Sequence, residues 1–144
     1  MDIRGAEVDQ IDAQRTSSFP IIIYTTPLAL VANEVYHIAS LLLLTHKPRL
    51  LRSAAGPRNV LSPMWHSQSI AGIATTDDAP EQWDPILVAG LLLIAKDMTH
   101  EAQQSAILER LGMMSKTTGM NLEQEIAMLR SDWSIAGYTE GMLD

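Results

Sequence analysis

The stretch that decides the fold is PLALVANEVYHIASLLLLTH, residues 27–46. Its apolar side chains recur close to the 3.6-residue period of an α-helix; they are Leu28, Val31, Val35, Ile38, Leu41, Leu42 and Leu44. Pro27 suits the first turn, because an N–H at that position would have no partner within the helix. We therefore expect one long helix that runs from Pro27 to about His46.

This helix is apolar enough to raise the question of a membrane. A span requires about 20 predominantly apolar residues, and Asn33, Glu34, His37 and Ser40 interrupt this segment. The start of the sequence lacks the basic residues and long apolar run of a secretory signal, and it is too acidic for a mitochondrial transit peptide. We predict a buried helix of a soluble, cytoplasmic protein without a membrane span.

Composition excludes several classes of protein. The chain has 144 residues, 47% hydrophobic residues, a net charge of −7 and no cysteine. Its length favours a single domain with its own core. The lack of cysteine excludes disulfides, thiolate metal sites and cysteine nucleophiles. Ten Lys and Arg residues against seventeen Asp and Glu argue against an independent nucleic-acid binder.

Two segments differ from the helical pattern. Residues 1–26 combine scattered acidic residues with small and polar ones, so we expect an N-terminal arm that is mobile and only partly ordered, followed by a helical domain over residues 27–144. Several proline and glycine residues after residue 46 indicate a loop. That loop carries a local basic patch of Lys47, Arg49, Arg52 and Arg58.

Further helices are expected between the proline, glycine and cap signals. They run from Ser62-Pro63 to about Thr75, from Pro80 or Asp84-Pro85 to Ala95, from a Thr99 cap to Gly119, and onward from an Asn121 cap. In the fourth helix we expect Met113 and Met114 inside. No stretch alternates for long with the period of a strand, so the predicted fold is all-α, a compact array of four to five main helices.

Glu34 and His37 are candidate acid/base residues, because they interrupt the most apolar helix in the first half of the chain. An apolar setting disfavours the charged form of a carboxyl group and raises its pKa toward values useful for proton transfer. A neighbouring imidazole can share the proton. The structural alternative places both side chains on the polar edge of an amphipathic helix.

His66 is the best single candidate for a base, if its helix lines a cavity. It stands beside Trp65 and close to two serine hydroxyls, and Trp65 would form a wall of the cavity. The structural alternative is a hydrogen-bonded packing histidine. Met64, Met113 and Met114 are further candidate walls of a channel, because thioether side chains adapt to flexible apolar ligands; ordinary core packing is the alternative.

Two segments place a carboxylate three residues before a histidine, Glu34 to His37 and Asp97 to His100. On facing helices, two such pairs form part of the ligand set of di-iron carboxylate bundles. Those sites also need inward carboxylates from two further helices, and the second pair here falls at an expected helix boundary. We therefore predict no metal site and no cofactor.

Several segments together resemble a known family. Residues 35–48, VYHIASLLLLTHKP, resemble the tyrosine-bearing helix ending in a histidine, a basic residue and a proline that recurs in the C-terminal regulatory domain of fungal zinc-cluster transcription factors. Residues 66–74 and 84–90 are similar to the next two helices of that domain, and residues 109–133 resemble its end. The likeness covers residues 28–137, but the six-cysteine DNA-binding module of the family is lacking.

The resemblance implies a function in fungal secondary metabolism. Small proteins that resemble this domain are encoded beside fungal reducing polyketide synthases, where the resemblance implies release of a 3,5-diketo polyketide thioester as an α-pyrone. Such lactonisation needs a base, a donor for the oxyanion and a dry channel, with no metal or nucleotide. His66 or the Glu34 and His37 pair would supply the base, and the basic loop would meet an acyl-carrier domain of the synthase.

Two other functions stay open at this point. One is a transcription-factor remnant that acts through protein–protein contacts without a reaction, and the other is a carrier that binds a polyketide chain and leaves bond making to the synthase. A homodimer is also expected, because a short piece of a larger helical domain should leave apolar surface uncovered.

Overall fold

The computed structural model describes residues 19–46 and 62–140. These residues form five α-helices and one 3₁₀ turn, without a strand: α2 (Pro27–His46), α3 (Pro63–Thr76), η2 (Pro80–Gln82), α4 (Pro85–Ala95), α5 (Glu101–Thr118) and α6 (Glu123–Glu140). The predicted all-α fold is confirmed. The basic patch in the 47–61 loop and residues 1–18 of the predicted arm lie outside the described residues.

Capping side chains set most helix starts. The Ser62 hydroxyl accepts the Trp65 N–H at 3.3 Å before α3, and the Asp84 carboxylate accepts the Leu87 N–H at 2.8 Å before α4. In each case a proline occupies the first helical position, where no N–H is needed. Local sequence signals therefore determine these two boundaries.

The later boundaries agree with the sequence except at one point. Gly119 ends α5 in the left-handed conformation, with φ of 76°, and the Asn121 side chain accepts the Glu123 N–H at the start of α6. The N-cap of α5 is His100, and its side chain makes no capping bond. The predicted Thr99 cap is therefore wrong by one residue, because the His100 carbonyl accepts the N–H groups of Gln103 and Gln104 at the start of α5.

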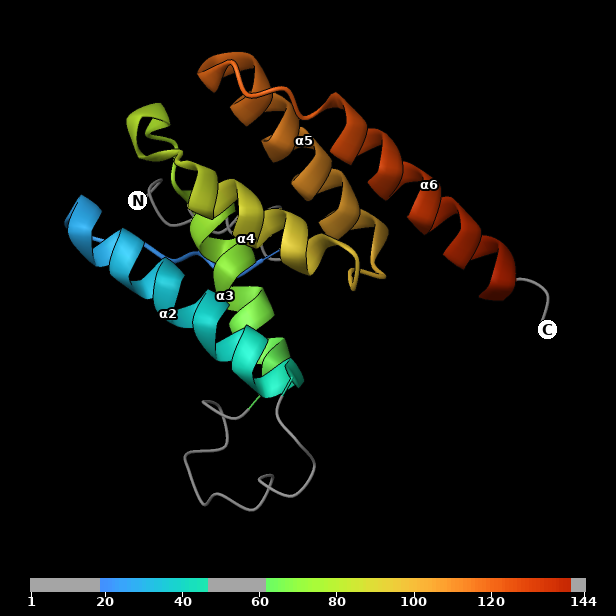
Figure 1. The fold of residues 1–144 in the computed structure, drawn as a ribbon, viewed down its shortest axis with the longest axis horizontal. Coiled ribbons are helices and arrows are strands. Elements are labelled where there is room, and N and C mark those ends of the chain that lie inside the picture. The colour runs from blue at the N-terminus through green and yellow to red at the C-terminus, as the bar shows by residue number, and fades with distance from the viewer. Residues whose placement is uncertain (1–18, 47–61, 141–144) are drawn as a thin grey trace, which may run out of the picture.

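Figure 1 shows the order of the layers. α3 and α4 occupy the middle, α2 forms one flank, and α5 and α6 form an antiparallel pair on the other side. The core lies between the layers, where burial of each large aliphatic side chain contributes roughly 1.5–3 kcal/mol. Side chains with almost no exposed surface are Ile70, Ile73, Leu87, Leu91, Ile94, Ile107, Leu111 and Met114.

The end of the N-terminal arm packs against α3. Phe19 is buried, and the Ile22 N–H donates to the Thr76 hydroxyl at 3.4 Å. A methyl group at Gly72 would lie 2.4 Å from the carbonyl oxygen of Pro20. The close approach of these two segments therefore depends on a glycine in the middle of α3.

Arg110 of α5 binds the C-terminal end of α3. Its guanidinium donates to the carbonyl oxygens of Thr75 and Asp77 and pairs with the Asp78 carboxylate at 2.9 Å. The same group lies 5.3 Å from the centroid of the Trp83 ring. A cation at this place complements the negative end of the α3 dipole.

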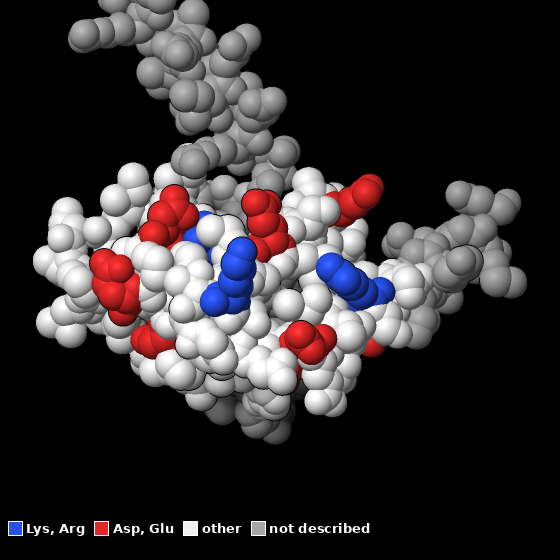
Figure 2. Space-filling model, turned by 90° about the horizontal axis from the view of Figure 1, so that it is seen from above, with Lys and Arg blue, Asp and Glu red and all other residues white. Residues whose placement is uncertain are grey.

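The surface seen from above the view of Figure 1, where α5 and α6 lie uppermost, is mostly uncharged, with acidic and basic side chains interspersed (Figure 2). On the flank, α2 is the one helix within residues 19–46 and 62–140 that is long and apolar enough to cross a membrane by length and composition. The core helix of a soluble protein passes the same test, so the predicted lack of a membrane span stays a prediction.

Candidate active site

The candidate site lies where α2 packs on α3. The Nδ1 atoms of His37 and His66 are 2.9 Å apart, and both side chains are buried. At this distance one nitrogen carries the hydrogen and donates it, while the other accepts. Two imidazolium ions cannot make this contact, so at least one ring is neutral.

The period of the helix places Glu34 and His37 on the buried side of α2. The buried residues of α2 are Leu30, Glu34, His37 and Leu41, at alternating intervals of four and three. This spacing keeps them on one face of the helix. Glu34 and His37 therefore lie on the same side of α2, toward α3 and α4, and not on a polar edge facing water.

His66 reaches the same interface from the first turn of α3. Its backbone N–H donates to the Ser62 carbonyl at 3.3 Å, so the turn that holds it begins directly at the capping serine. The His66 side chain has no exposed surface. The capping residue that starts α3 therefore also fixes the position of the His66 imidazole.

Glu34 is a buried acid without a hydrogen-bond partner. Its side chain is 0% exposed, and neither Oε1 nor Oε2 has a partner among the described residues. Burial disfavours the carboxylate and, together with the charge of Asp84, raises the pKa of Glu34 to about 8. At neutral pH the group is a neutral acid that can donate a proton.

The pKa of His37 moves in the opposite direction. Burial and the neighbouring His66 lower it to about 4, so the ring is neutral at physiological pH. A neutral acid and a neutral base thus share one helix face. Titratable groups whose environments push their pKa values apart are typical of acid/base sites.

Two aromatic rings border the histidine pair. The Trp65 ring centroid lies 4.9 Å from that of His37 and 4.8 Å from that of His66. The Tyr36 centroid lies 5.1 Å and 5.8 Å from the same two rings. Both aromatic side chains are partly exposed, so they form the boundary between the buried imidazoles and solvent.

The four residues predicted to line a channel differ in their exposure and in what they contact. Trp65 contacts the histidine pair, whereas Met64, in the first turn of α3, is 66% exposed. Met114 belongs to the solid core, but Met113 is 43% exposed, so its predicted inside position is wrong. The buried stripe of α5 runs through Ile107, Leu111 and Met114, and one residue along a helix turns a side chain by about 100°.

Tyr36 is the site residue that the residue-by-residue analysis missed. Its ring borders both histidines, although it stands one position away from the inward stripe. The available signal was that Tyr36 is the one Phe, Tyr or Trp residue of α2. Asp97 and His100 are both exposed, and no group of three or more metal-ligating side chains occurs within residues 19–46 and 62–140.

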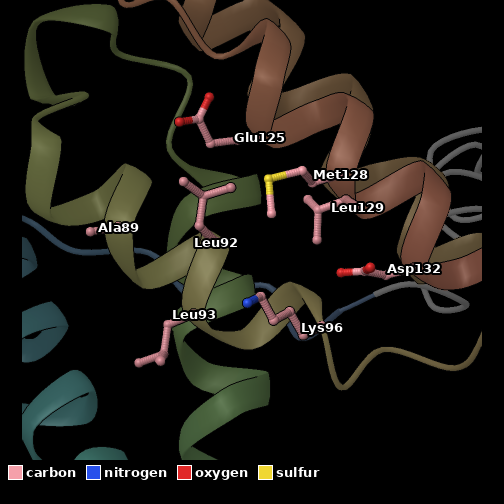
Figure 3. Close-up of a pocket in the computed structure, with 8 residues that line it drawn as sticks. All are labelled: Ala89, Leu92, Leu93, Lys96, Glu125, Met128, Leu129 and Asp132. Atoms are coloured by element: carbon pink, nitrogen blue, oxygen red, sulfur yellow. The ribbon is translucent and has the colours of Figure 1, made fainter.

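A second hollow lies away from the histidines. A cleft of about 380 Å³ lies between α4 and α6. Figure 3 shows Leu92 and Met128 pointing toward one another across it. Lys96, Glu125 and Asp132 supply its charged groups; Ala89, Leu93 and Leu129 complete the lining. None of the predicted site residues lines this cleft. Its two walls come from separate helices, so no local pattern predicts it.

No protein-family model matches the chain, and no curated protein or solved structure is similar to it. No family assignment follows. The resemblance to the regulatory domain of zinc-cluster transcription factors therefore stays a hypothesis carried by the residues quoted for it.

Proposed function

We propose that this protein is an acid/base catalyst that closes a 3,5-diketo polyketide thioester to an α-pyrone. The observation that carries the proposal is the joint burial of a carboxyl group and two contacting imidazoles between α2 and α3. A carboxyl group without hydrogen-bond partners costs stability. Such a cost is typical of a site kept for chemistry.

The reaction needs one proton acceptor and one proton donor. The δ-enol oxygen attacks the thioester carbonyl carbon, a C–O bond forms, and the enol proton passes to the His37–His66 pair, in which His37 is neutral. The carbonyl then reforms as the C–S bond breaks, and the thiolate leaves with the proton that the histidine pair took from the enol. Neutral Glu34 donates to the oxygen that becomes negative in the tetrahedral intermediate.

The Trp65 and Tyr36 rings separate the buried imidazoles from solvent and offer a surface to the substrate. Trp65 and Tyr36 are 37% and 44% exposed, so they can contact a substrate that approaches from solvent. Behind them the imidazoles are almost free of water contact, which strengthens each hydrogen bond to a developing charge. The resemblance adds the substrate class, because its small relatives accompany polyketide synthases.

A carrier function is the second candidate, and the cleft between α4 and α6 favours it. Leu92, Met128 and Leu129 give the cleft an apolar wall of adaptable side chains. A protein that only holds a polyketide chain would use this cleft and would not need Glu34 or the histidines.

The discriminating experiment incubates the purified protein with a synthetic 3,5-diketo acyl thioester and follows lactone by mass spectrometry. Turnover that drops about a hundredfold in Glu34→Gln or His66→Asn, the usual scale for a lost acid or base, supports the catalyst. His100→Asn is the matched control, because His100 is exposed at the start of α5. Saturable binding without lactone, weakened by Leu92→Asp, would instead assign the carrier function. Neither turnover nor binding would favour the protein-contact alternative.

A further inference from the structure

The side of α2 that points away from the core is apolar and uncovered. Five exposed residues lie along it at alternating intervals of four and three; this outer stripe consists of Leu28, Ala32, Val35, Ala39 and Leu42. Leu28 is 79% exposed, and Val35 and Leu42 are 45% and 40% exposed. Figure 1 shows α2 at the edge of the fold. A helix at this place therefore offers a long apolar surface to a partner.

The outer stripe is symmetric about its middle residue. Read in either direction, it is Leu, Ala, Val, Ala, Leu. A two-fold axis through Val35 brings Leu28 of one copy against Leu42 of the other and brings Ala32 within one residue of Ala39. Self-complementarity of this kind is the requirement of an interface between two identical chains.

The spacing and the size of the residues also suit a pair of helices. Alternating steps of three and four give the seam along which two helices pack nearly parallel or antiparallel. The two alanines alternate with larger residues along the outer stripe. The helix backbones can therefore approach each other at the alanines, while Leu28 and Leu42 fill the space between the helices at the ends of the stripe. The opposite, inner stripe of α2 uses the same spacing to pack on its own domain.

No charge on α2 opposes a second copy. The carboxyl and imidazole side chains of α2 are Glu34, His37 and His46. Glu34 and His37 point inward and are buried, and His46 is at the C-terminal end of the helix. A lipid bilayer fits less well, because the inner side of this helix packs on α3 and holds the two ionisable residues.

We propose that two copies of this chain associate through their α2 helices, antiparallel, with the two-fold axis at Val35. The contact would run along residues 28–43, about 24 Å of helix. With the flanking side chain Leu43, which is 72% exposed, it would bury on the order of 1,000 Å² in total. This area is at the lower limit for a specific interface, so dimer and monomer should exchange with concentration. The proposal stands independently of the catalytic function.

The first test is the mass of the full-length chain in solution by sedimentation equilibrium over a range of concentrations. The wild type should be a reversible dimer, and Val35→Glu should raise its dissociation constant about a hundredfold or more, because the substitution places two like charges at the axis. Ile86→Glu is the matched control, because Ile86 is also 45% exposed but lies on α4. Circular dichroism checks that both variants keep the wild-type helical signal.

A second test determines whether the two α2 helices are antiparallel or parallel. The chain has no cysteine, so single cysteines can be introduced without interference. Val35→Cys should cross-link to itself with a short bismaleimide, and Leu28→Cys mixed with Leu42→Cys should give a mixed dimer. Leu28→Cys alone should not, because two such residues would be roughly 21 Å apart along antiparallel helices.

Three results would overturn the proposal. These are a wild-type monomer at all concentrations, a dimer that Val35→Glu leaves intact, and efficient cross-linking of Leu28→Cys alone, which would mean parallel helices. A fourth is flotation of the wild type, but not of Val35→Glu, with phosphatidylcholine vesicles in place of dimer formation. That result would assign the outer stripe to a bilayer.

Discussion

His37 Nδ1 lies 2.9 Å from His66 Nδ1, although 29 residues separate the two histidines in the chain. The contact joins the two helices at their buried interface and links a neutral base to the partly exposed Trp65 and Tyr36 rings. Glu34, one turn before His37, adds a buried acid to the same helix face. The proposed chemistry and several measurable properties follow from this arrangement.

Stability should fall between about pH 4.5 and pH 8 because of Glu34. Its pKa is about 8 in the folded protein and 4.5 ordinarily, so between these values the folded state holds a proton that the unfolded state has released. The free energy of unfolding attributed to Glu34 is therefore highest below pH 4.5 and falls by about 1.4 kcal/mol per pH unit up to pH 8.

Urea unfolding at several pH values tests this dependence. Glu34→Gln should remove about 2 kcal/mol of the decline between pH 6.5 and pH 8, because an amide does not ionise. Subtracting the variant from the wild type cancels the contributions of other groups, such as Asp77, whose pKa is also raised by burial. Equal declines in both proteins would show that Glu34 is ionised at neutral pH.

His37 should stay neutral well below pH 6. In an NMR titration its ring signals should move with a midpoint near pH 4, because burial and His66 oppose the charged ring. The folded state then binds fewer protons than the unfolded state between pH 4 and 6.5, so this residue's contribution to stability is lost as the pH falls through that window. His66→Asn should raise the His37 midpoint; a wild-type midpoint near 6.5 would contradict the buried contact.

Three glycine substitutions should affect stability in a fixed order. Gly72→Ala should destabilise most, by about 1–3 kcal/mol, because the new methyl group meets the backbone oxygen of Pro20 at 2.4 Å. Gly90→Ala meets the Cδ1 atom of Ile38 at 2.7 Å, the end of a side chain that can move, so its cost should be smaller.

Gly112→Ala is the control within the same series. Nothing lies within 4 Å of the added methyl group, and alanine favours a helix over glycine by about 1 kcal/mol, so this variant should be more stable than the wild type. Thermal unfolding of the three variants gives the order. A Gly72→Ala protein as stable as the wild type would mean that the arm does not pack on α3 as described.

Arg110 should contribute strongly to stability. Arg110→Met keeps much of the side-chain volume but removes the Arg110 donor to the Thr75 carbonyl and the pair with Asp78. The Asp77 carbonyl loses one of its two donors and keeps the Trp83 indole N–H. We expect a loss of about 2–4 kcal/mol in chemical unfolding. Arg130→Met, on an exposed position of α6, should change stability by less than about 0.5 kcal/mol.

The sequence predicts the helices well because their signals are local. Ser62-Pro63, Asp84-Pro85 and Gly119 act within one turn of their own positions, and each marks a boundary of the structure. The predicted Thr99 cap fails by one residue, because the first hydrogen bonds of α5 go to the His100 carbonyl and not to that of Thr99.

The site is less predictable, because it depends on how helices meet. The inward direction of Glu34 and His37 follows from the apolar period of α2, but the contact between His37 and His66 depends on the packing of α2 on α3. The placement of Met113 fails for the same reason, since apolar character alone does not say which face a neighbouring helix covers. The cleft between α4 and α6 has no local signature at all.

The pH dependence of kcat/KM for lactone formation tests the central claim most directly. The rate constant should fall below pH 4, where His37 becomes charged, and above pH 8, where Glu34 loses its proton, with a plateau between these values. After subtraction of the uncatalysed reaction, Glu34→Gln should retain about a hundredth of the wild-type rate and lose the alkaline limb. Full activity of this variant with an unchanged alkaline limb would contradict the assignment of Glu34 as the acid.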